Sequence, residues 1–147
     1  HWDSYEAGAR RAGRNASRRD WRMVREVFVA PSDDEAWELS VNGPMGRMMG
    51  EYFLPLLKAF GFEEFLAAPD APPDSAIDVD YCAQHNWFVG SPETVAAKIE
   101  KVYSEVGGFG HLLLFCFDYA DQPSVWQRSM ELLAREVMPQ LTHLTGD

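Results

Sequence analysis

The fold of this chain is decided by residues 86–118, which read NWFVGSPETVAAKIEKVYSEVGGFGHLLLFCFD. The apolar start predicts a short strand that runs straight into a helix, because Ser91 is a favoured N-cap and Pro92 suits the first helical position. The glycines at 107–108 predict the end of that helix, and the apolar residues 111–117 predict a second strand. Strand, helix and strand in this order form a βαβ unit with parallel strands and a right-handed crossover. Since parallel strands need both faces covered, the unit must belong to a larger α/β sheet or barrel.

A further strand is predicted upstream, over residues 21–30, where valine and phenylalanine favour β structure. Arg25 and Glu26 interrupt its apolar run on opposite faces. One of these two side chains must point toward packed helices or toward a barrel interior, where it needs a partner.

Helices are predicted on both sides of this strand and after the βαβ unit. Helical spacing favours one over residues 2–13, and a capping box of Ser32 and Glu35 predicts another directly after the strand. Asp121 is expected to cap a last helix, which Pro139 is expected to end.

An apolar stretch interrupts this alternation between about residues 43 and 80. Its methionines, phenylalanines and leucines predict one or two helices, and residues 69–74 predict a loop. Such an insertion can be a lid over a pocket, an oligomer surface, or a segment that only packs on the body. We therefore expect one partial-barrel domain over residues 1–147, with a helical insertion at about 43–80.

The composition is that of a globular domain. The chain has 147 residues, of which 46% are hydrophobic, and none of its apolar runs approaches the roughly 18–20 residues of a membrane helix. Its net charge is −10, although seven of the 13 lysines and arginines lie within residues 10–25. The acidic body argues against nucleic acid as a partner. The arginine cluster is either a phosphate or partner patch or, more simply, a solvated helix end.

Cysteine usage favours a reducing compartment, and we expect the cytoplasm. The two cysteines are unclustered and there is no signal-peptide pattern, so neither a disulfide framework nor a zinc site is expected. Cys116 lies in a predicted apolar strand and is expected to be buried, whereas Cys82 lies in a stretch that predicts irregular structure. Because the chain opens on His1, it is expected to be a piece of a longer protein.

Two residues at predicted strand ends are candidates for ligand binding. Ser91 opens a helix whose free amides could hold an anion, although capping alone explains the residue. Asp118 follows the last strand and could orient a ligand, although aspartate more often satisfies turn amides. The sequence carries no self-sufficient catalytic set and no metal-ligand spacing.

Several stretches in the same order resemble the C-terminal end of luciferase-like flavin-dependent monooxygenases, of the limonene-monooxygenase type. The similarity is carried by residues 87–96, by the glycines and leucines of 107–114, by 128–139, and also by 21–36 and 45–61.

This resemblance implies the C-terminal portion of a (β/α)8 barrel enzyme. Such an enzyme uses reduced FMN, delivered by a separate flavin reductase, to activate O2 and oxygenate a small apolar substrate. The family's phosphate-binding and catalytic residues lie upstream of the matched part, so the catalytic residues here are unknown and the part alone is expected to be inactive. This part is expected to contribute side chains to the wall and the lid of the active site. Ser91 and Asp118 are expected to bind the cofactor, and Arg47 and Tyr52 to bind the substrate.

Three parallel strands cannot close a barrel, which needs about 250 residues. We expect open edges at 21–30 and 111–117 and an uncovered inner face, hidden by self-association into a homo-oligomer or by other polypeptide. Two further functions remain open: a non-catalytic interaction module, and a deazaflavin-dependent oxidoreductase of the same superfamily.

Overall fold

The computed structural model describes residues 1–68, 71–72 and 74–144. Its strands are β1 (Arg22–Val29), β2 (Phe88–Gly90) and β3 (His111–Phe115). Its α-helices are α1 (Trp2–Arg11), α2 (Asp33–Ser40), α3 (Pro44–Met48), α4 (Leu54–Ala59), α5 (Val79–His85), α6 (Pro92–Val106) and α7 (Pro123–Leu132). A π-helical turn, Met49–Phe53, joins α3 to α4, and helical turns over Leu133–Val137 and Met138–Leu144 continue α7. Short 3-10 turns lie at Arg18–Asp20 and Glu63–Leu66.

The three strands form one parallel sheet in the order β2-β1-β3. The carboxyl half of β1 pairs with β2, with Phe28 opposite Val89, and its first half pairs with β3, with Val24 opposite Leu113. The expectation that 21–30 forms an edge is therefore wrong, because β1 is the central strand. The eight residues of β1 give room for two partners, since β3 pairs along its first part and β2 along its last three residues.

Lys98 of α6 covers the outer edge of β2. The amide of Ala30, just past β1, donates to the carbonyl of Gly90, so the carbonyls of Trp87 and Val89 face away from β1. The Lys98 Nζ donates to these two carbonyls at 3.2 and 3.1 Å. Desolvation in this half-buried position lowers the pKa of Lys98, and nearby Asp33 opposes that shift. The side chain thus satisfies acceptors that an unpaired edge would expose.

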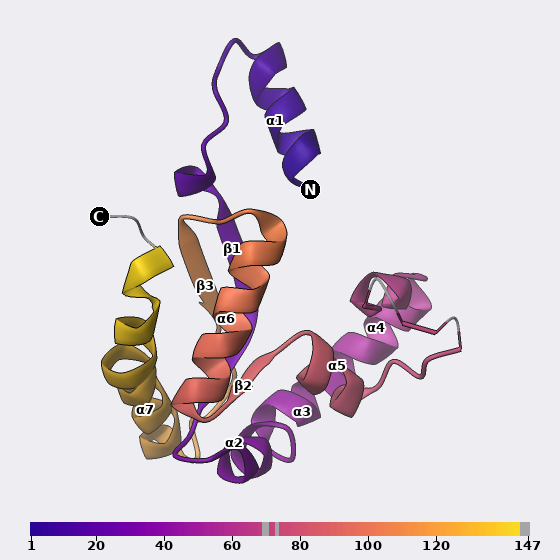
Figure 1. Ribbon diagram of the computed structural model, residues 1–147. Coiled ribbons are helices and arrows are strands. Elements are labelled where there is room, and N and C mark those ends of the chain that lie inside the picture. The colour runs from indigo at the N-terminus through magenta and orange to yellow at the C-terminus, as the bar shows by residue number, and fades with distance from the viewer. Residues whose placement is uncertain (69–70, 73, 145–147) are drawn as a thin grey trace.

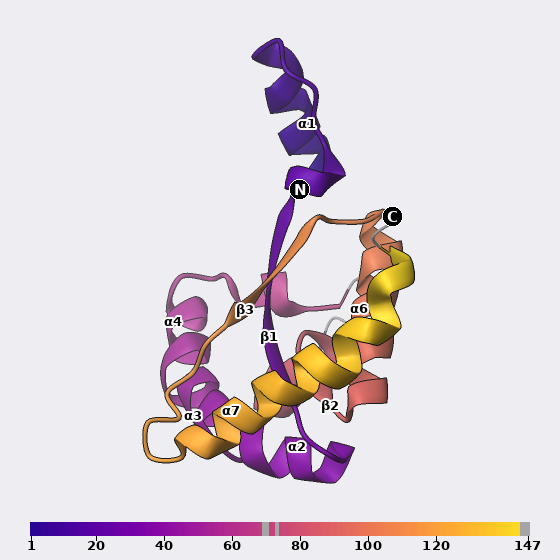
Figure 2. The same ribbon diagram turned by 90° about the vertical axis from the view of Figure 1, so that its left-hand side faces the viewer.

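Helices cover one face of the sheet along its length. Figures 1 and 2 show α6 and α7 packed beside the strands, with the helices α2–α5 gathered near the carboxyl end of β1. Val27 and Val29 of β1 point into this outer layer, and so do Leu112 and Leu114 of β3. The buried residues of this outer core are Val27, Val29, Phe88, Val95, Ala96, Ile99, Leu132, Leu133, Val137 and Leu141.

The opposite face is covered only near its carboxyl end. There Phe28 stacks on Tyr119 at 5.5 Å and belongs to a core with the buried Met45, Cys82 and Trp87. Farther back, side chains of β1 and β3 on the same face remain partly open to solvent. We call the set Val24, Glu26, Leu113 and Phe115 the inner face; its apolar members are 38–50% exposed. The expected uncovered face is thus present.

Some local predictions were wrong. Cys116 is exposed because β3 ends at Phe115, and Cys82 is fully buried because it lies in α5, a helix that the sequence did not predict. The N-cap of α7 is Gln122 rather than Asp121, and the chain continues helically past Pro139 to Leu144. The predicted loop at 69–74 falls partly on residues 69–70 and 73, which lie outside the described part.

Helix α1 buries none of its residues and stands away from the body, above the start of β1 (Figure 1). Arg18 links α1 to the loop before β3. Its guanidinium lies 3.8 Å from the centroid of the Trp2 ring and donates to the carbonyl of Gly108 at 3.3 Å. Trp2 also contacts Trp21, with 5.3 Å between ring centroids. At least one member of the arginine cluster therefore has a structural role.

Candidate functional site

The carboxyl ends of β1 and β2 are linked by a polar network around Asp33. Asp33 opens α2 directly after β1, and one of its oxygens accepts a hydrogen bond from the backbone amide of Ser91 at 2.6 Å. The other accepts from the Thr94 hydroxyl at 3.0 Å. These bonds, chiefly the one from the Ser91 amide, lower the pKa of Asp33. The carboxylate therefore stays ionised to lower pH than an ordinary aspartate does, and it links α2 to the start of α6.

Gly90 allows this close approach. Its φ of +152° disfavours an L side chain, and an added Cβ would lie 2.7 Å from the Asp33 Oδ1 and 2.6 Å from the Thr94 Cγ2. The glycine therefore serves the packing of the two strand ends against each other.

Ser91 caps α6, as the sequence predicts. Its hydroxyl accepts from the amide of Thr94 at 3.3 Å, while its own amide donates to Asp33. The anion-binding position at the start of this helix is thus filled by a carboxylate of the chain itself. A cofactor-binding role for Ser91 stays a prediction, and this geometry favours capping.

Asp118 lies on the loop after β3, where it is exposed. Its Oδ1 accepts from the amide of Ala120 at 2.9 Å, which is the turn-forming contact that short polar side chains commonly make. Its role toward a cofactor also stays a prediction.

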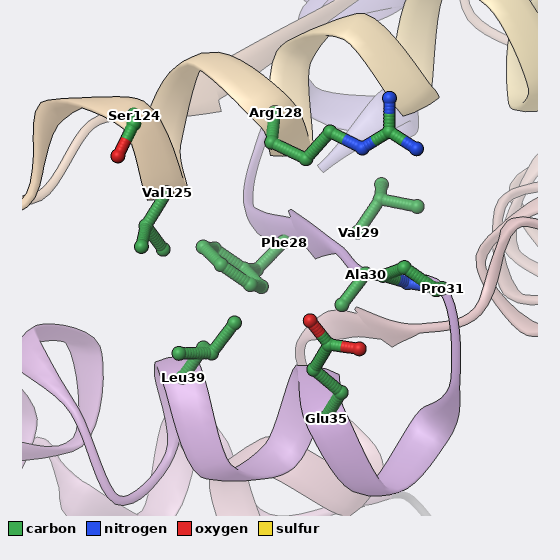
Figure 3. Close-up of a pocket in the computed structure, with 9 residues that line it drawn as sticks. All are labelled: Phe28, Val29, Ala30, Pro31, Glu35, Leu39, Ser124, Val125 and Arg128. Atoms are coloured by element: carbon green, nitrogen blue, oxygen red, sulfur yellow. The ribbon is translucent and has the colours of Figure 1, made fainter.

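A small hollow of about 160 Å³ lies between α2 and α7, beside the end of β1. Figure 3 shows Phe28 and Val125 in its wall, with Glu35 of α2 and Arg128 of α7 on opposite sides. Its volume is below the roughly 300–1,000 Å³ typical of ligand pockets. The hollow can therefore take a side chain or a few waters, but not a flavin.

The inner face supplies a larger apolar wall with one acid group. Glu26 lies opposite Phe115 in the register of β1 and β3, and burial raises the pKa of this carboxyl. The backbone of Glu26 and the neighbouring Arg25 partly oppose that shift. Of Arg25 and Glu26, Glu26 is thus the one that lies on the inner face.

Phe53 closes one side of this wall. Its ring contacts Phe115 edge-on, with 5.8 Å between centroids, and Phe115 in turn contacts Phe117 at 5.2 Å. The sequence did not identify Phe53, because the π-helical turn Met49–Phe53 alters the rotation between successive side chains. A run of aromatic residues at 52–53 was the available signal.

Arg47 and Tyr52 are both exposed on the insertion. The rings of Tyr52 and Phe53 are in contact, with 5.3 Å between their centroids. Phe53 therefore lies between Tyr52 and the inner face. Arg47 lies in α3. The structure does not bring these two residues together with Ser91 or Asp118, and a substrate-binding role for them stays a prediction.

Comparison with known proteins places this geometry in context. No family model matches the chain. It is 33% identical over 141 residues to 3,6-diketocamphane 1,6-monooxygenase of Pseudomonas putida, covering 96% of the chain and 37% of that protein. It is 30% identical over 147 residues to limonene 1,2-monooxygenase of Rhodococcus erythropolis, covering 100% of the chain and 34% of that protein.

A solved structure agrees with these matches. It is a type II Baeyer-Villiger monooxygenase, the oxygenating constituent of 3,6-diketocamphane monooxygenase from Pseudomonas putida in complex with FMN. It superposes with a TM-score of 0.84 at 34% identity, over 95% of this chain and 38% of that one. The chain is homologous to part of the luciferase-like flavin monooxygenases.

The resemblance read from the sequence is thereby confirmed, as is the fold of a partial (β/α)8 barrel. A monooxygenase from Streptomyces bottropensis, RslO1, shares the fold at 20% identity, with a TM-score of 0.59. The chain spans less than two fifths of the luciferase-like monooxygenases that it matches. Among the described residues, no helix is long and apolar enough to cross a membrane, and no group of side chains is placed to hold a metal.

Proposed function

We propose that this chain forms part of a flavin-dependent monooxygenase that oxygenates a small apolar substrate. The observation that carries the proposal is the similarity over 95% of the chain to an FMN-bound monooxygenase. The curated relatives act, by their names, on diketocamphanes and limonene, which are apolar terpenoids. In such an enzyme, reduced FMN would supply the electrons that activate O2.

The described residues are better suited to contact an apolar substrate than to bind the phosphate group of FMN. The inner face offers Val24, Leu113 and Phe115 as a wall that excludes water. At the start of α6, by contrast, the amides of Ser91 and Thr94 already donate to oxygens of the chain itself. The FMN phosphate would therefore be held by other polypeptide of the same enzyme.

Glu26 gives this wall one position that can carry a proton. Burial raises its pKa, so the carboxyl keeps its proton to a higher pH than an ordinary glutamate does. Within the proposed enzyme, Glu26 would orient a polar atom of the substrate while Phe53 and Phe115 hold its apolar part.

The remaining parts of the proposal follow from the type of enzyme. The partner that delivers reduced FMN is a separate flavin reductase, the enzyme acts in the cytoplasm, and it forms a homo-oligomer. Residues 1–147 form a single partial-barrel domain, with the insertion at about 43–80 as its lid.

A chimera tests this function. Residues 1–147 replace the matched 37% of 3,6-diketocamphane 1,6-monooxygenase, and FMN binding, O2 consumption and oxygenated product are measured with a flavin reductase present. We expect the chimera to bind FMN and oxygenate a bicyclic ketone, and the isolated chain to be inactive.

A folded chimera that binds no FMN would contradict the proposal, with circular dichroism showing that it is folded. Turnover with a deazaflavin and no O2 consumption would instead support the hydride-transferring alternative. A chimera carrying Leu113→Arg, which puts a charge on the inner face, should bind FMN but lose most product formation.

A further inference from the structure

The insertion meets the inner face at the ring of Phe53. This ring lies edge-on to that of Phe115, with 5.8 Å between centroids, and the rings of Phe115 and Phe117 are 5.2 Å apart. We call Phe53, Phe115 and Phe117 the aromatic corner. It adjoins Glu26, which lies opposite Phe115 in the register of β1 and β3. Residues from the insertion, from β3 and from the segment after β3 thus form one apolar surface.

A π-helical turn between α3 and α4 carries Phe53. The amide of Leu54 donates to the carbonyl of Met49, five residues back, whereas an α-helix uses the carbonyl four residues back. The turn therefore holds one residue more than an α-helical turn and changes the direction of the side chains around it. Such turns are rare in proteins and occur frequently at functional sites. The turn is thus a second observation, separate from the ring contact, that points to a function for Phe53.

The helical segment that carries Phe53 is packed closely on α5. Gly46 and Gly50 both face Val79, and an added Cβ at either glycine would lie 3.2 Å from a methyl carbon of that valine. Glycine at these two positions therefore allows the close approach of the two helices. Met49, at the start of the π-helical turn, is buried in the same core. Phe53 thus stands on a closely packed helix rather than on a loose loop.

The aromatic corner lies at the end of the sheet where barrel enzymes place their sites. Phe115 is the last residue of β3, and the insertion follows α2 beyond the carboxyl end of β1 (Figure 1). Phe115 is 38% exposed and Phe53 is partly buried, so both rings keep surface that does not pack on the described part of the chain. A substrate bound at this end of the inner face would therefore contact both rings.

We propose that Phe53 is a specificity-determining residue that limits the size of the substrate. Its ring stands where the insertion reaches over the inner face, so it bounds the space in front of Phe115. Three rings that meet at a corner match a compact, ring-shaped molecule, and an alicyclic ketone is the substrate class that we assign to this surface. The inference rests on the proposed function and names the residue through which that function selects its substrate.

The first experiment measures size selection in the chimera described above. Its probes are cyclopentanone, norbornanone and adamantanone, which share one carbonyl group and increase in size. Phe53→Ala should raise kcat/KM for adamantanone relative to cyclopentanone by about tenfold or more, and Phe53→Leu should raise it less. Titration calorimetry without the reductase should show the same change in the dissociation constants. Phe60→Ala is the matched control, because Phe60 is an aromatic residue of the same insertion that is 66% exposed and stacks on Phe62.

The second experiment tests the ring contact in the chain itself. Phe53→Leu, Phe115→Leu and the double variant are compared by urea unfolding. The combined effect on the unfolding equilibrium constant should differ from the product of the single effects by roughly two- to tenfold, as for other paired aromatic rings. The same cycle with Phe60→Leu in place of Phe53→Leu is the control, and there the effects should multiply.

The outcomes separate this inference from the function on which it rests. If Phe53→Ala lowers kcat/KM for all three ketones by the same factor, Phe53 only packs against other polypeptide of the enzyme, and the inference is overturned while the monooxygenase assignment stands. Independent effects of Phe53→Leu and Phe115→Leu on unfolding would also overturn it. A folded chimera that binds no FMN would contradict the proposed function, and the inference would fall with it.

Discussion

Glu26 and Phe115 lie directly opposite each other in the register of β1 and β3, so a carboxyl group and a partly exposed ring share one face of the sheet. Burial against this apolar wall raises the pKa of Glu26. In the folded chain the carboxyl therefore binds its proton more tightly than in the unfolded chain. Between the ordinary and the raised pKa, folding takes up protons, and the free energy of unfolding falls as the pH rises.

Glu26→Gln should remove this pH dependence. We expect the variant to unfold at higher urea concentration than the parent at neutral pH, where the parent holds a partly buried carboxylate, and to match it in acid, where that group is protonated. Urea unfolding from about pH 4 to about pH 8 measures the difference. Glu105→Gln, at an exposed ion pair on α6, is the control. It should change the urea midpoint by the same amount at the acidic and at the neutral end of this pH range. A constant difference at every pH would contradict the assignment.

Gly90→Ala should destabilise the chain by about 2–3 kcal/mol, because the new methyl group meets both Asp33 and Thr94 in a backbone conformation that disfavours side chains. Gly61→Ala separates these causes. Gly61 also has a positive φ, +68°, but an added Cβ there has no neighbour within 4 Å. We expect it to cost about 1 kcal/mol, and equal costs at the two positions would argue against the close approach at Gly90.

Asp33→Ala should cost about 0.5–1 kcal/mol, a modest figure because the group is largely exposed to solvent, which weakens its bonds to Ser91 and Thr94. Since its pKa is lowered in the fold, its stabilisation is present above the ordinary aspartate pKa and is lost as the pH falls through the lowered value. The difference from the parent should therefore shrink in acid. Asp34→Ala, the next residue on the same helix turn, should show a smaller effect, and thermal unfolding at several pH values compares the two.

Lys98→Met should lower stability by about 1–3 kcal/mol, since the methionine keeps the apolar stem but leaves the carbonyls of Trp87 and Val89 without their donor. The exposed Lys101→Met on the same helix is the control and should change little. Amide exchange should also quicken in β2. An unchanged unfolding midpoint for the Lys98 variant would show that water replaces the ammonium without cost.

Features set by neighbouring residues were predictable from the sequence. The start of α6 at Pro92 and its end at Gly107, where φ is +74°, follow from capping chemistry that acts within one helical turn. The capping bond at Ser32 is of the same kind, with the Glu35 amide donating to its hydroxyl at 3.2 Å.

Features set by distant contacts were not predictable. The bond between Asp33 and Ser91 joins residues 58 positions apart and has no local signal. The strand order depends on which edge of β1 each partner takes, and an apolar pattern does not distinguish the two edges. The burial of Cys82 and the exposure of Cys116 depend on α5 and on where β3 ends, so the prediction for each cysteine failed through its surroundings.

Lys98 has a consequence for how such an arc is completed. Any strand that pairs with the outer edge of β2 would bond to the carbonyls of Trp87 and Val89, to which the Lys98 ammonium already donates. Strand pairing at this edge is then an exchange of hydrogen bonds. The bonds from Lys98 must break before an incoming strand can form its own backbone bonds to β2. The energetic advantage of closure on that side is therefore smaller than the number of new backbone bonds implies.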